Sequence, residues 1–451
     1  LYKLNRGVVI SLDNIALAIE LAKHSDLRIY CCIENSIEID KARELVNKSG
    51  LSSLRIRVEE GPLNALTYPK LVANIFLCDS KLDPTQLKEI SRLLRPDGYL
   101  YVKKTKEDIG LSEMKNFIAK NDPANWKEPI KIGENYCVQK SMLPGAADWG
   151  HYYREPNNNR YSPDKLIKAP LRLLWYGEPI APLGDLFLTQ GFSAGGRLYL
   201  TDASPNDTSR ARITCLDAFN GTQLWVREAG GSRFEKMEGA KKDDDVRVLQ
   251  MPGWVQPGSM AVSSEKIYLA DNTECLVLDA VTGKDITQFK APAPTDAKNH
   301  WRYVAYLDEL LIGYTNATTP IPVRNQPLLP SEGGAPSLFA INKNSGEKIW
   351  VRLGSEADEL GIKFSRPIAI GEKIIFIKAE RSLIAIDLNT GKTKWKNDNI
   401  DDVNNELWWE GTVTNGQFIL SKFNIRGWSD KTKKIATQTF SVKDGALVNQ
   451  S

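Results

Sequence analysis

The residue types that most often bind metals or act as nucleophiles are sparse in this sequence of 451 residues. The three histidines, His24, His151 and His300, lie far apart, and the six cysteines show no Cys-x-x-Cys pair and no metal-ligand spacing. Several cysteines fall inside apolar, strand-like runs, where a free thiol behaves as a small hydrophobic side chain. The pattern therefore predicts no metal site and no catalytic residues of the Cys/His kind.

Composition excludes further classes of function. The net charge is +3, the balance of 59 basic and 56 acidic residues, which is too small to indicate a nucleic-acid surface. No run of about 18 apolar residues occurs, so we expect no transmembrane segment. The chain begins at Leu1 and not at methionine, so we expect that a signal peptide was removed before this point.

The first 140 residues alternate predicted strands with predicted helices. Apolar runs predict strands over 7–12, 27–35, 53–60 and 73–80, and helical spacing predicts helices over 14–25, 36–50 and 84–94. A turn at Arg95–Gly98 and a strand from Tyr99 follow. Strands that alternate with helices predict a parallel sheet covered on both faces.

The order of these elements, together with "LLRPDGYLYV" (93–102), resembles the class I S-adenosylmethionine-dependent methyltransferase fold over about residues 4–140. In that family a glycine-rich turn follows the first strand, whereas the turn here, Ser11 to Ile15, has no glycine. Glu34 stands near the position where the family places a carboxylate for the ribose, and it is either that candidate cofactor residue or a solvated loop residue. We expect a degenerate Rossmann-like domain that binds no cofactor and serves in packing or docking.

Residues 141–170 change character and are rich in Pro, Asn, Gly and aromatic residues. No helical or strand period is present, and the segment is predicted to be an ordered connector packed by Trp149, Tyr152, Tyr153 and Tyr161. Its Trp and Arg-Tyr-Ser-Pro, followed by the Leu and Trp of "LRLLW" (171–175), resemble in their order the segment that leads into the propeller of quinoprotein dehydrogenases.

Beyond residue 170 a sequence pattern repeats. Its copies are "ITCLDAFNGTQLW" (213–225), "LVLDAVTGKDIT" (276–287), "LFAINKNSGEKIW" (338–350), "LIAIDLNTGKTKW" (383–395) and a shortened "TFSVKDGALV" (439–448). The aligned residues Asp217, Asp279, Asn342 and Asp387 are 62, 63 and 45 residues apart, and a second apolar strand precedes each copy. This spacing is typical of the blades of a propeller.

Each repeated residue has a structural explanation. Asp or Asn starts a tight turn by accepting hydrogen bonds from amides two and three residues later. The glycines supply a positive φ, and the tryptophans offer a large apolar face to the neighbouring blade. The glycines are Gly221, Gly283, Gly346 and Gly391, and the tryptophans are Trp225, Trp350 and Trp395, with Thr287 in the corresponding place of the second copy.

The repeat resembles the tryptophan-docking repeat of pyrroloquinoline-quinone-like propellers, over about residues 170–451. That family includes calcium- and quinone-dependent alcohol dehydrogenases and the non-enzymatic propeller of outer-membrane assembly. In the dehydrogenases an adjacent cysteine pair lies over the quinone, but the only adjacent pair here, Cys31–Cys32, is in the N-terminal domain. Alternation along a strand sends its two side chains to opposite faces. We therefore expect no quinone and no other cofactor.

The predicted architecture is α/β plus all-β. Residues 1–140 form the degenerate methyltransferase-like Rossmann domain, 141–170 the connector, and 171–451 a quinoprotein-like β-propeller with about five recognisable blades. Either the hairpins close as a small propeller, with residues 171–177 completing the last sheet, or the chain ends before the remaining blades.

Two hypotheses about function follow. The first is a non-catalytic scaffold or protein-interaction subunit of a larger exported bacterial assembly, in the periplasm or a comparable lumen, which organises copies of a redox enzyme. Its partners are other protein subunits or itself. Trp408 and Trp409 are candidate interface anchors, with core packing as the alternative. The second hypothesis is an enzyme, either a quinone-dependent dehydrogenase or a methyltransferase.

Overall fold

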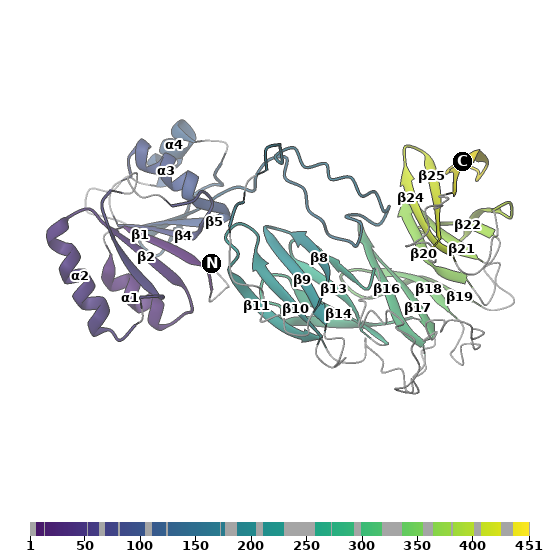
Figure 1. The fold of residues 1–451 in the computed structure, drawn as a ribbon, viewed down its shortest axis with the longest axis horizontal. Helices are drawn as coiled ribbons and strands as arrows, with labels where there is room; N and C mark the ends of the chain where they lie inside the picture. The colour runs from purple at the N-terminus through teal and green to yellow at the C-terminus, as the bar shows by residue number, and fades with distance from the viewer. Residues whose placement is uncertain are drawn as a thin grey trace.

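The chain comprises an N-terminal α/β unit followed by five four-stranded sheets (Figure 1). It is known from a computed structural model. The structure describes residues 6–12, 14–51, 53–62, 68–79, 82–103, 111–122, 125–171, 173–175, 187–203, 211–229, 258–271, 273–292, 299–317, 336–354, 364–379, 382–400, 407–424 and 436–450.

The α/β unit is built on one seven-stranded sheet in the order β3-β2-β1-β4-β5-β7-β6. The five strands from β3 to β5 are parallel, whereas β7 runs antiparallel to both β5 and β6. From β1 the chain adds β2 and β3 on one side, and it then places β4 and β5 on the other side of β1, as in doubly wound sheets. This strand order confirms the Rossmann-like fold class. The elements are β1 (Val8–Leu12), α1 (Ile15–Lys23), β2 (Arg28–Ile33), α2 (Ser36–Lys48), β3 (Ile56–Glu60), β4 (Ala73–Cys78), α3 (Pro84–Leu93), β5 (Leu94–Val102), α4 (Leu111–Asn121), β6 (Ile130–Ile132) and β7 (Asn135–Gln139).

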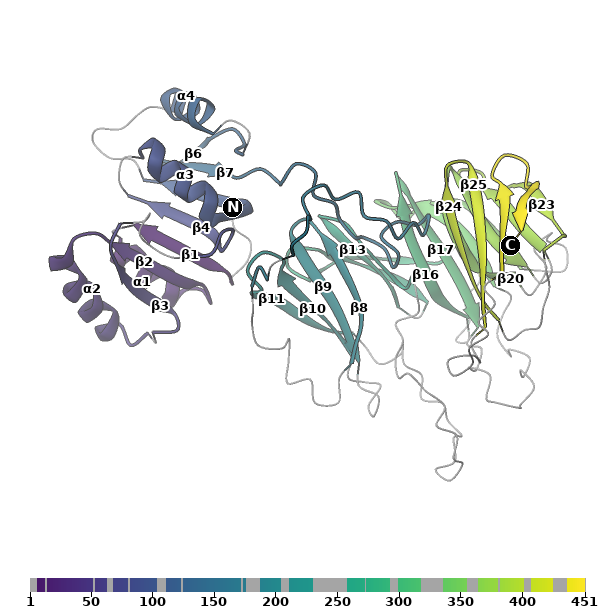
Figure 2. The ribbon, with the colours of Figure 1, turned by 45° about the horizontal axis from the view of Figure 1, so that its top comes forward.

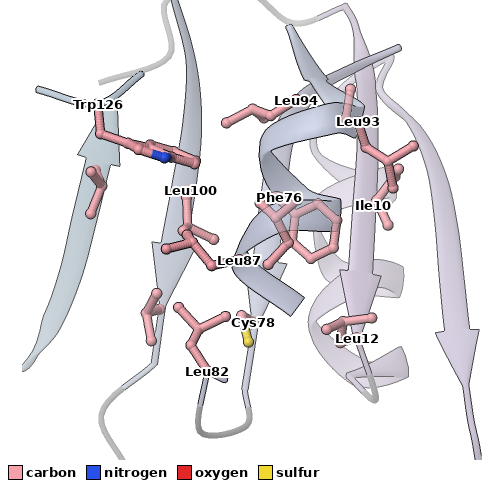
Figure 3. Packing of buried hydrophobic residues seen from close by; sticks show 14 of the residues in the cluster. Ile10, Leu12, Phe76, Cys78, Leu82, Leu87, Leu93, Leu94, Leu100 and Trp126 are labelled. Carbon is pink, nitrogen blue, oxygen red and sulfur yellow. The ribbon is translucent and has the colours of Figure 1, made fainter. Parts of the chain in front are cut away.

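Helices cover both faces of this sheet, because buried strands carry apolar residues on both sides. On one face α3 and α4 pack over the sheet, and Figure 3 shows Leu87 and Leu93 of α3 directed toward Phe76 and Ile10. On the other face α1 and α2 pack against a second cluster that contains Cys31. Cys32 belongs to the first cluster, so the adjacent cysteines lie on opposite faces.

No helix within the described ranges is long and apolar enough to cross a membrane.

The predicted turn at Arg95–Gly98 lies inside a strand and interrupts its pairing with β4. Strand β5 begins at Leu94, directly after α3, and contains the whole Arg-Pro-Asp-Gly stretch. Asp97 has a positive φ of 61°, and the pairing of β5 with β4 is irregular between Ala73 and Ile75. A bulge in the strand therefore takes the place of a separate turn.

The five remaining sheets are antiparallel and each is formed by four consecutive strands, which we call blades 1 to 5. Blade 1 contains β8 (Phe187–Ala194), β9 (Arg197–Ala203), β10 (Ala211–Asp217) and β11 (Gln223–Ala229). Blade 2 contains β12 (Met260–Val262), β13 (Lys266–Asp271), β14 (Glu274–Asp279) and β15 (Asp285–Lys290). Blade 3 contains β16 (Asn299–Leu307), β17 (Leu310–Ala317), β18 (Ser337–Asn342) and β19 (Lys348–Leu353). Blade 4 contains β20 (Phe364–Gly371), β21 (Ile374–Ala379), β22 (Ser382–Asp387) and β23 (Thr393–Asn397), and blade 5 contains β24 (Leu407–Thr414), β25 (Gln417–Asn424), β26 (Ala436–Ser441) and β27 (Leu447–Gln450).

The blades confirm the propeller fold class. The sequence repeat covers the third and fourth strands of each blade, and the apolar strand before it is the second. Apolar clusters fill the space between each pair of neighbouring blades, so the core of this part is shared between sheets. First strands of successive blades also contact one another, at β8–β12, β12–β16 and β20–β24, which places them on the inner side of the array.

The described blades follow one another from blade 1, beside the α/β unit, to blade 5 at the opposite end (Figures 1 and 2). All four strands of blade 5 come from residues 407–450. Residues 171 and 173–175 are in no strand. The prediction that this segment completes the last sheet is therefore wrong for the described residues.

Candidate functional site

The carboxyl ends of β1 and β4 meet at the point where the order of the parallel strands reverses, which is where doubly wound folds bind ligands. Asn14 caps α1 there, and its Oδ1 accepts a hydrogen bond of 2.8 Å from the Leu17 amide. The Asn14 side-chain amide donates to Asp79, directly after β4, and Lys103 Nζ lies 3.4 Å from the same carboxylate. Asp79 Oδ1 is buried and accepts no hydrogen bond within the part of the chain that is described.

The hydrogen bond between the Asn14 and Asp79 side chains links the ends of the two strands at this edge. Glu34, the candidate from the sequence, follows β2 directly and is exposed at the same edge. The structure thus brings Glu34 to the edge where ligands of such sheets bind.

The repeated Asp and Asn residues form equivalent turns. Asp387 Oδ1 accepts from the amides of Asn389 and Thr390 at 3.1 and 3.0 Å, and Asn342 Oδ1 accepts from Asn344 and Ser345 at 2.8 and 3.0 Å. Asp279 and Asp217 accept from the amides two and three residues later in the same way. Gly221, Gly283, Gly346 and Gly391 have φ values of 72°, 71°, 74° and 70°.

An aromatic ring from the outer strand of one blade lies on the glycine of the next blade's turn. A Cβ on Gly391 would come within 2.6 Å of the Trp350 ring, and one on Gly283 within 2.7 Å of the Trp225 ring. The indole N–H of Trp350 donates to Leu388 O at 2.9 Å, which fixes the ring against the turn. Each glycine is needed for this close approach as well as for its φ.

Two members of this series depart from the sequence pattern. Thr287 does not dock, and Phe289, two residues later on the same face of β15, lies on Gly346 instead, 2.4 Å from where a Cβ would be. In the shortened fifth copy, Gly445 has a φ of 72° and receives the Trp395 ring, whose N–H donates to Val442 O at 2.9 Å. A search for aromatic residues six positions after the turn glycine, as well as four, would have found Phe289.

Trp175, which the sequence analysis did not single out, makes the corresponding contact on blade 1. Its ring lies 2.5 Å from where a Cβ on Gly221 would be, and its N–H donates to Ala218 O at 3.0 Å. Trp175 is outside every described strand. The turn of each of the five blades therefore carries an aromatic ring.

The connector contains a segment, residues 147–160, that lies along the first strands of all five blades; we call it the strap. It exchanges backbone hydrogen bonds with β8 (Trp149 with Ser193, 2.7 and 3.0 Å), and Gly150 O accepts from Val262 N of β12 at 2.7 Å. Farther along, Pro156 O accepts from Ile370 N of β20 at 2.7 Å, and Asn157 O accepts from Val413 N of β24 at 3.0 Å. Figure 1 shows the chain running from the α/β unit toward β24.

At blade 3 a buried side chain makes the connection. His151 Nε2 accepts from the Tyr306 amide of β16 at 3.3 Å, and its ring lies 4.6 Å from the Tyr306 ring. Burial lowers the pKa of His151 to about 4, so that the imidazole is neutral and able to accept. At blade 5 the Tyr153 hydroxyl donates to Glu410 at 2.5 Å, and Arg160 pairs with the same carboxylate while lying over the Tyr153 ring.

A buried polar cluster joins the α/β unit to blade 1. Asn74 of β4 donates to Asp217 Oδ2 at 2.7 Å, and Arg95 Nε of β5 lies 3.1 Å from the same oxygen. Asn74 Oδ1 accepts from Asn220 at 2.9 Å and from the Val8 amide at 2.8 Å. Asp217 is therefore both a turn former and the anchor of this junction, a role that the repeat pattern does not reveal.

The cysteines are placed as small core residues. All six are buried; Cys215 and Cys275 lie in blades 1 and 2, and burial raises the pKa of Cys31 to about 12. Among the described residues no group of three or more His, Cys, Asp or Glu could hold a metal ion. Trp408 and Trp409 lie in β24, but their side chains are outside the described residues.

Comparison with protein families matches the propeller part of the chain. Residues 172–413 match the family model described as outer membrane protein assembly factor BamB. No curated protein matches the chain.

Solved structures resemble the two parts separately. A SAM-dependent methyltransferase from Aquifex aeolicus is 16% identical, with a TM-score of 0.27, over 32% of this chain and 85% of that protein. The quinohemoprotein alcohol dehydrogenase ADHIIG from Pseudomonas putida HK5 is 13% identical, with a TM-score of 0.38, over 68% of this chain. A europium-containing methanol dehydrogenase is 12% identical, with a TM-score of 0.37, over the same share. The chain spans 48% and 58% of the lengths of these two dehydrogenases.

Proposed function

Because the chain belongs to the family described as outer membrane protein assembly factor BamB, we propose that it is a non-catalytic protein-interaction subunit of a larger exported assembly. Its partners are other protein subunits, and its site of action is the periplasm or a comparable lumen. Within such an assembly it would organise copies of a redox enzyme. The resemblance of its repeat to quinoproteins suggests this task.

The observation that carries the proposal is the strap. Propellers surround a central channel, and the first strands of the blades lie on that side. Here the channel side of every blade hydrogen-bonds to residues of the strap. One backbone amide in the first strand of each blade is thus engaged by the chain itself.

The repeated residues support the same proposal. Turn formation and aromatic docking account for the Asp, Gly and Trp residues of the pattern, as for Asp387, Gly391 and Trp350. The repeat that resembles a cofactor protein is therefore explained by the way in which blades pack.

Calorimetric titration tests the proposal against both enzyme hypotheses. The full chain is titrated with S-adenosylmethionine and, separately, with pyrroloquinoline quinone in the presence of calcium. We expect no saturable heat from either ligand. Micromolar binding of either one would overturn the proposed function.

A further inference from the structure

The middle of the strap, residues 150–152, is held on blades 2 and 3 by linked hydrogen bonds. The Val262 amide donates to Gly150 O at 2.7 Å, and the Tyr306 amide donates to His151 Nε2 at 3.3 Å. The Tyr306 hydroxyl also donates to Val262 O, at 3.0 Å. The strap lies close to the blades here, since a Cβ on Gly150 would come within 2.5 Å of Val262 O. A change at His151 therefore reaches both blades.

His151 can make its contact only while its imidazole is neutral. An imidazolium carries an N–H group on both nitrogens and has no acceptor for the Tyr306 amide. His151 is 8% exposed, so a charge on its ring would also be removed from water. Burial accordingly lowers the pKa of His151 to about 4, although a hydrogen bond with the Arg154 backbone acts in the opposite direction. Protonation thus opposes the bound position of this side chain.

Other titratable groups surround this side chain in the described structure. They are Asp148, Arg154 and Glu155 of the strap, Tyr306 of β16, and Tyr268 of β13, whose ring lies 5.8 Å from the Tyr306 ring. Arg154 pairs with Glu155 at 2.5 Å, so these two charges compensate each other. Burial raises the pKa of Tyr306 to about 12, so it stays neutral in acid. Burial also raises the pKa of Asp148, so its protonation favours the bound strap and opposes the effect of His151.

The turn that carries His151 has a strained backbone. His151 and Arg154 exchange backbone hydrogen bonds of 3.1 and 3.0 Å, and Arg154 has a φ of 78°. This left-handed conformation is unfavourable for a residue with a long side chain, and it persists only where surrounding contacts hold it. Once the Tyr306 contact is lost, Arg154 can return to an ordinary backbone conformation. The turn therefore favours release.

The two ends of the strap have anchors that do not depend on His151. On blade 1, Trp149 and Ser193 exchange two backbone hydrogen bonds, and on blade 5 the Asn158 side-chain amide donates to Gly411 O at 2.8 Å. The apolar clusters between the blades are built from residues of the blades themselves. The middle of the strap can therefore leave while its ends and the blades keep their contacts.

We propose that the strap is an acid-sensitive clamp: protonation of His151 releases residues 150–152 from blades 2 and 3, while the ends of the strap stay bound. The step transfers one proton from solvent to His151 Nε2 and breaks the hydrogen bonds from the Tyr306 and Val262 amides. Acid would thereby free the inner edge of these two blades without unfolding them. The inference goes beyond the proposed function, because it holds whether or not the chain has a partner subunit, and the calorimetric titrations test that function separately.

Hydrogen exchange of the full chain at pH 7 and pH 5, measured residue by residue, tests the inference. The protection factor is compared, because it corrects for the effect of pH on the intrinsic rate of exchange. We expect protection of the Tyr306 and Val262 amides to fall about 20-fold, since the released imidazole binds a proton at its ordinary pKa of 6.5 and the buried one at about 4. Unchanged protection at Tyr306 would overturn the inference.

Amides farther along the strap distinguish release of its middle from a larger opening. Ile370 and Val413 donate to Pro156 and Asn157, beyond the turn, and should stay better protected than Tyr306 at pH 5. Amides that exchange through one common opening have equal protection factors. Equal values at Tyr306, Ile370 and Val413 would therefore mean that the whole strap opens or the blades unfold, and would overturn the inference.

Matched variants assign the effect to one histidine. In His151→Gln the amide oxygen can still accept from the Tyr306 amide but does not titrate, so the 20-fold fall should be lost. His24→Gln changes a histidine whose side chain is 80% exposed and should leave the fall unchanged. Asp148→Asn removes the opposing titration and should enlarge the fall, which keeps the test decisive if His151→Gln does not fold. A fall that persists in His151→Gln, disappears in His24→Gln or shrinks in Asp148→Asn would contradict the inference.

Discussion

At the scale of single residues, the repeat is a set of turn and docking contacts. Gly391 has a φ of 70° and lies directly beneath the Trp350 ring, whereas Gly416, with a φ of 73°, has open space around it. The two glycines therefore share a backbone requirement but differ in the close approach. Comparing them separates the contribution of docking from that of the turn.

Replacement of these glycines by alanine should have unequal effects. Gly416→Ala should cost about 1 kcal/mol, the strain of a left-handed residue with a Cβ. Gly391→Ala should cost roughly 2 to 4 kcal/mol, because the added methyl group also displaces the Trp350 ring. Urea unfolding followed by circular dichroism measures both values. Equal losses would mean that the ring does not need the glycine.

Removal of a docking ring should depend on its burial. Trp350 is 8% exposed, so Trp350→Ala should lower the free energy of unfolding by roughly 3 to 5 kcal/mol. Trp395 is only partly buried, so Trp395→Ala should cost less. Chemical unfolding of the two variants checks this order. A Trp395→Ala variant of unchanged stability that loses a bound ligand would instead point to a cofactor site.

At the scale of elements, the strap joins the blades through backbone groups and one buried histidine. His151 has a pKa of about 4 in the folded chain, below its ordinary value of 6.5. The unfolded chain therefore takes up this proton first as the pH falls. The contribution of His151 to stability is complete above about pH 6.5 and decreases between pH 6.5 and 4.

Acidification should weaken the unaltered chain more than a His151→Gln variant, whose amide oxygen can still accept from the Tyr306 amide but does not titrate. The difference in their pH dependence should approach about 3 kcal/mol between pH 6.5 and 4. Urea unfolding at several pH values measures it. Parallel curves for the two proteins would show that His151 is not buried against Tyr306.

Elements with a regular period could be predicted from the sequence, and elements without one could not. Strands β1 to β5 and helices α1 to α3 of the α/β unit, and the second to fourth strands of the blades, follow apolar alternation or helical spacing. The sequence analysis predicted neither α4 nor β6 and β7. The first strands are three to nine residues long and include glycine and proline, so no common pattern marks them. The strap was predicted as an ordered connector, but its backbone contacts leave no pattern in side-chain types.

At the scale of the whole molecule, the junction between the α/β unit and blade 1 depends on a buried ion pair. Arg95 and Asp217 are 4% and 0% exposed, and Asn74 of β4 also donates to Asp217. Sequence analysis marked Asp217 only as a turn residue, because its partners are 122 and 143 residues away. Long-range pairs of this kind cannot be read from a repeat.

Asp217→Asn should keep the turn, since Asn342 performs the same role in blade 3, but leave the Arg95 charge buried without its partner. The expected loss is about 3 to 5 kcal/mol, with separate unfolding of the α/β unit and the propeller. Asp387→Asn, at a more exposed turn, should cost less than about 1 kcal/mol. Thermal unfolding followed by calorimetry distinguishes them. A single unchanged transition for Asp217→Asn would contradict the proposed coupling.

The central claim is that the chain itself occupies the inner edges of its blades. Hydrogen exchange at the amides of Ile370 and Val413 tests this most directly, because each donates to a carbonyl of the strap. The account predicts slow exchange at both amides in the full chain, unchanged by pyrroloquinoline quinone with calcium. Fast exchange that slows only when the quinone and calcium are added would contradict it.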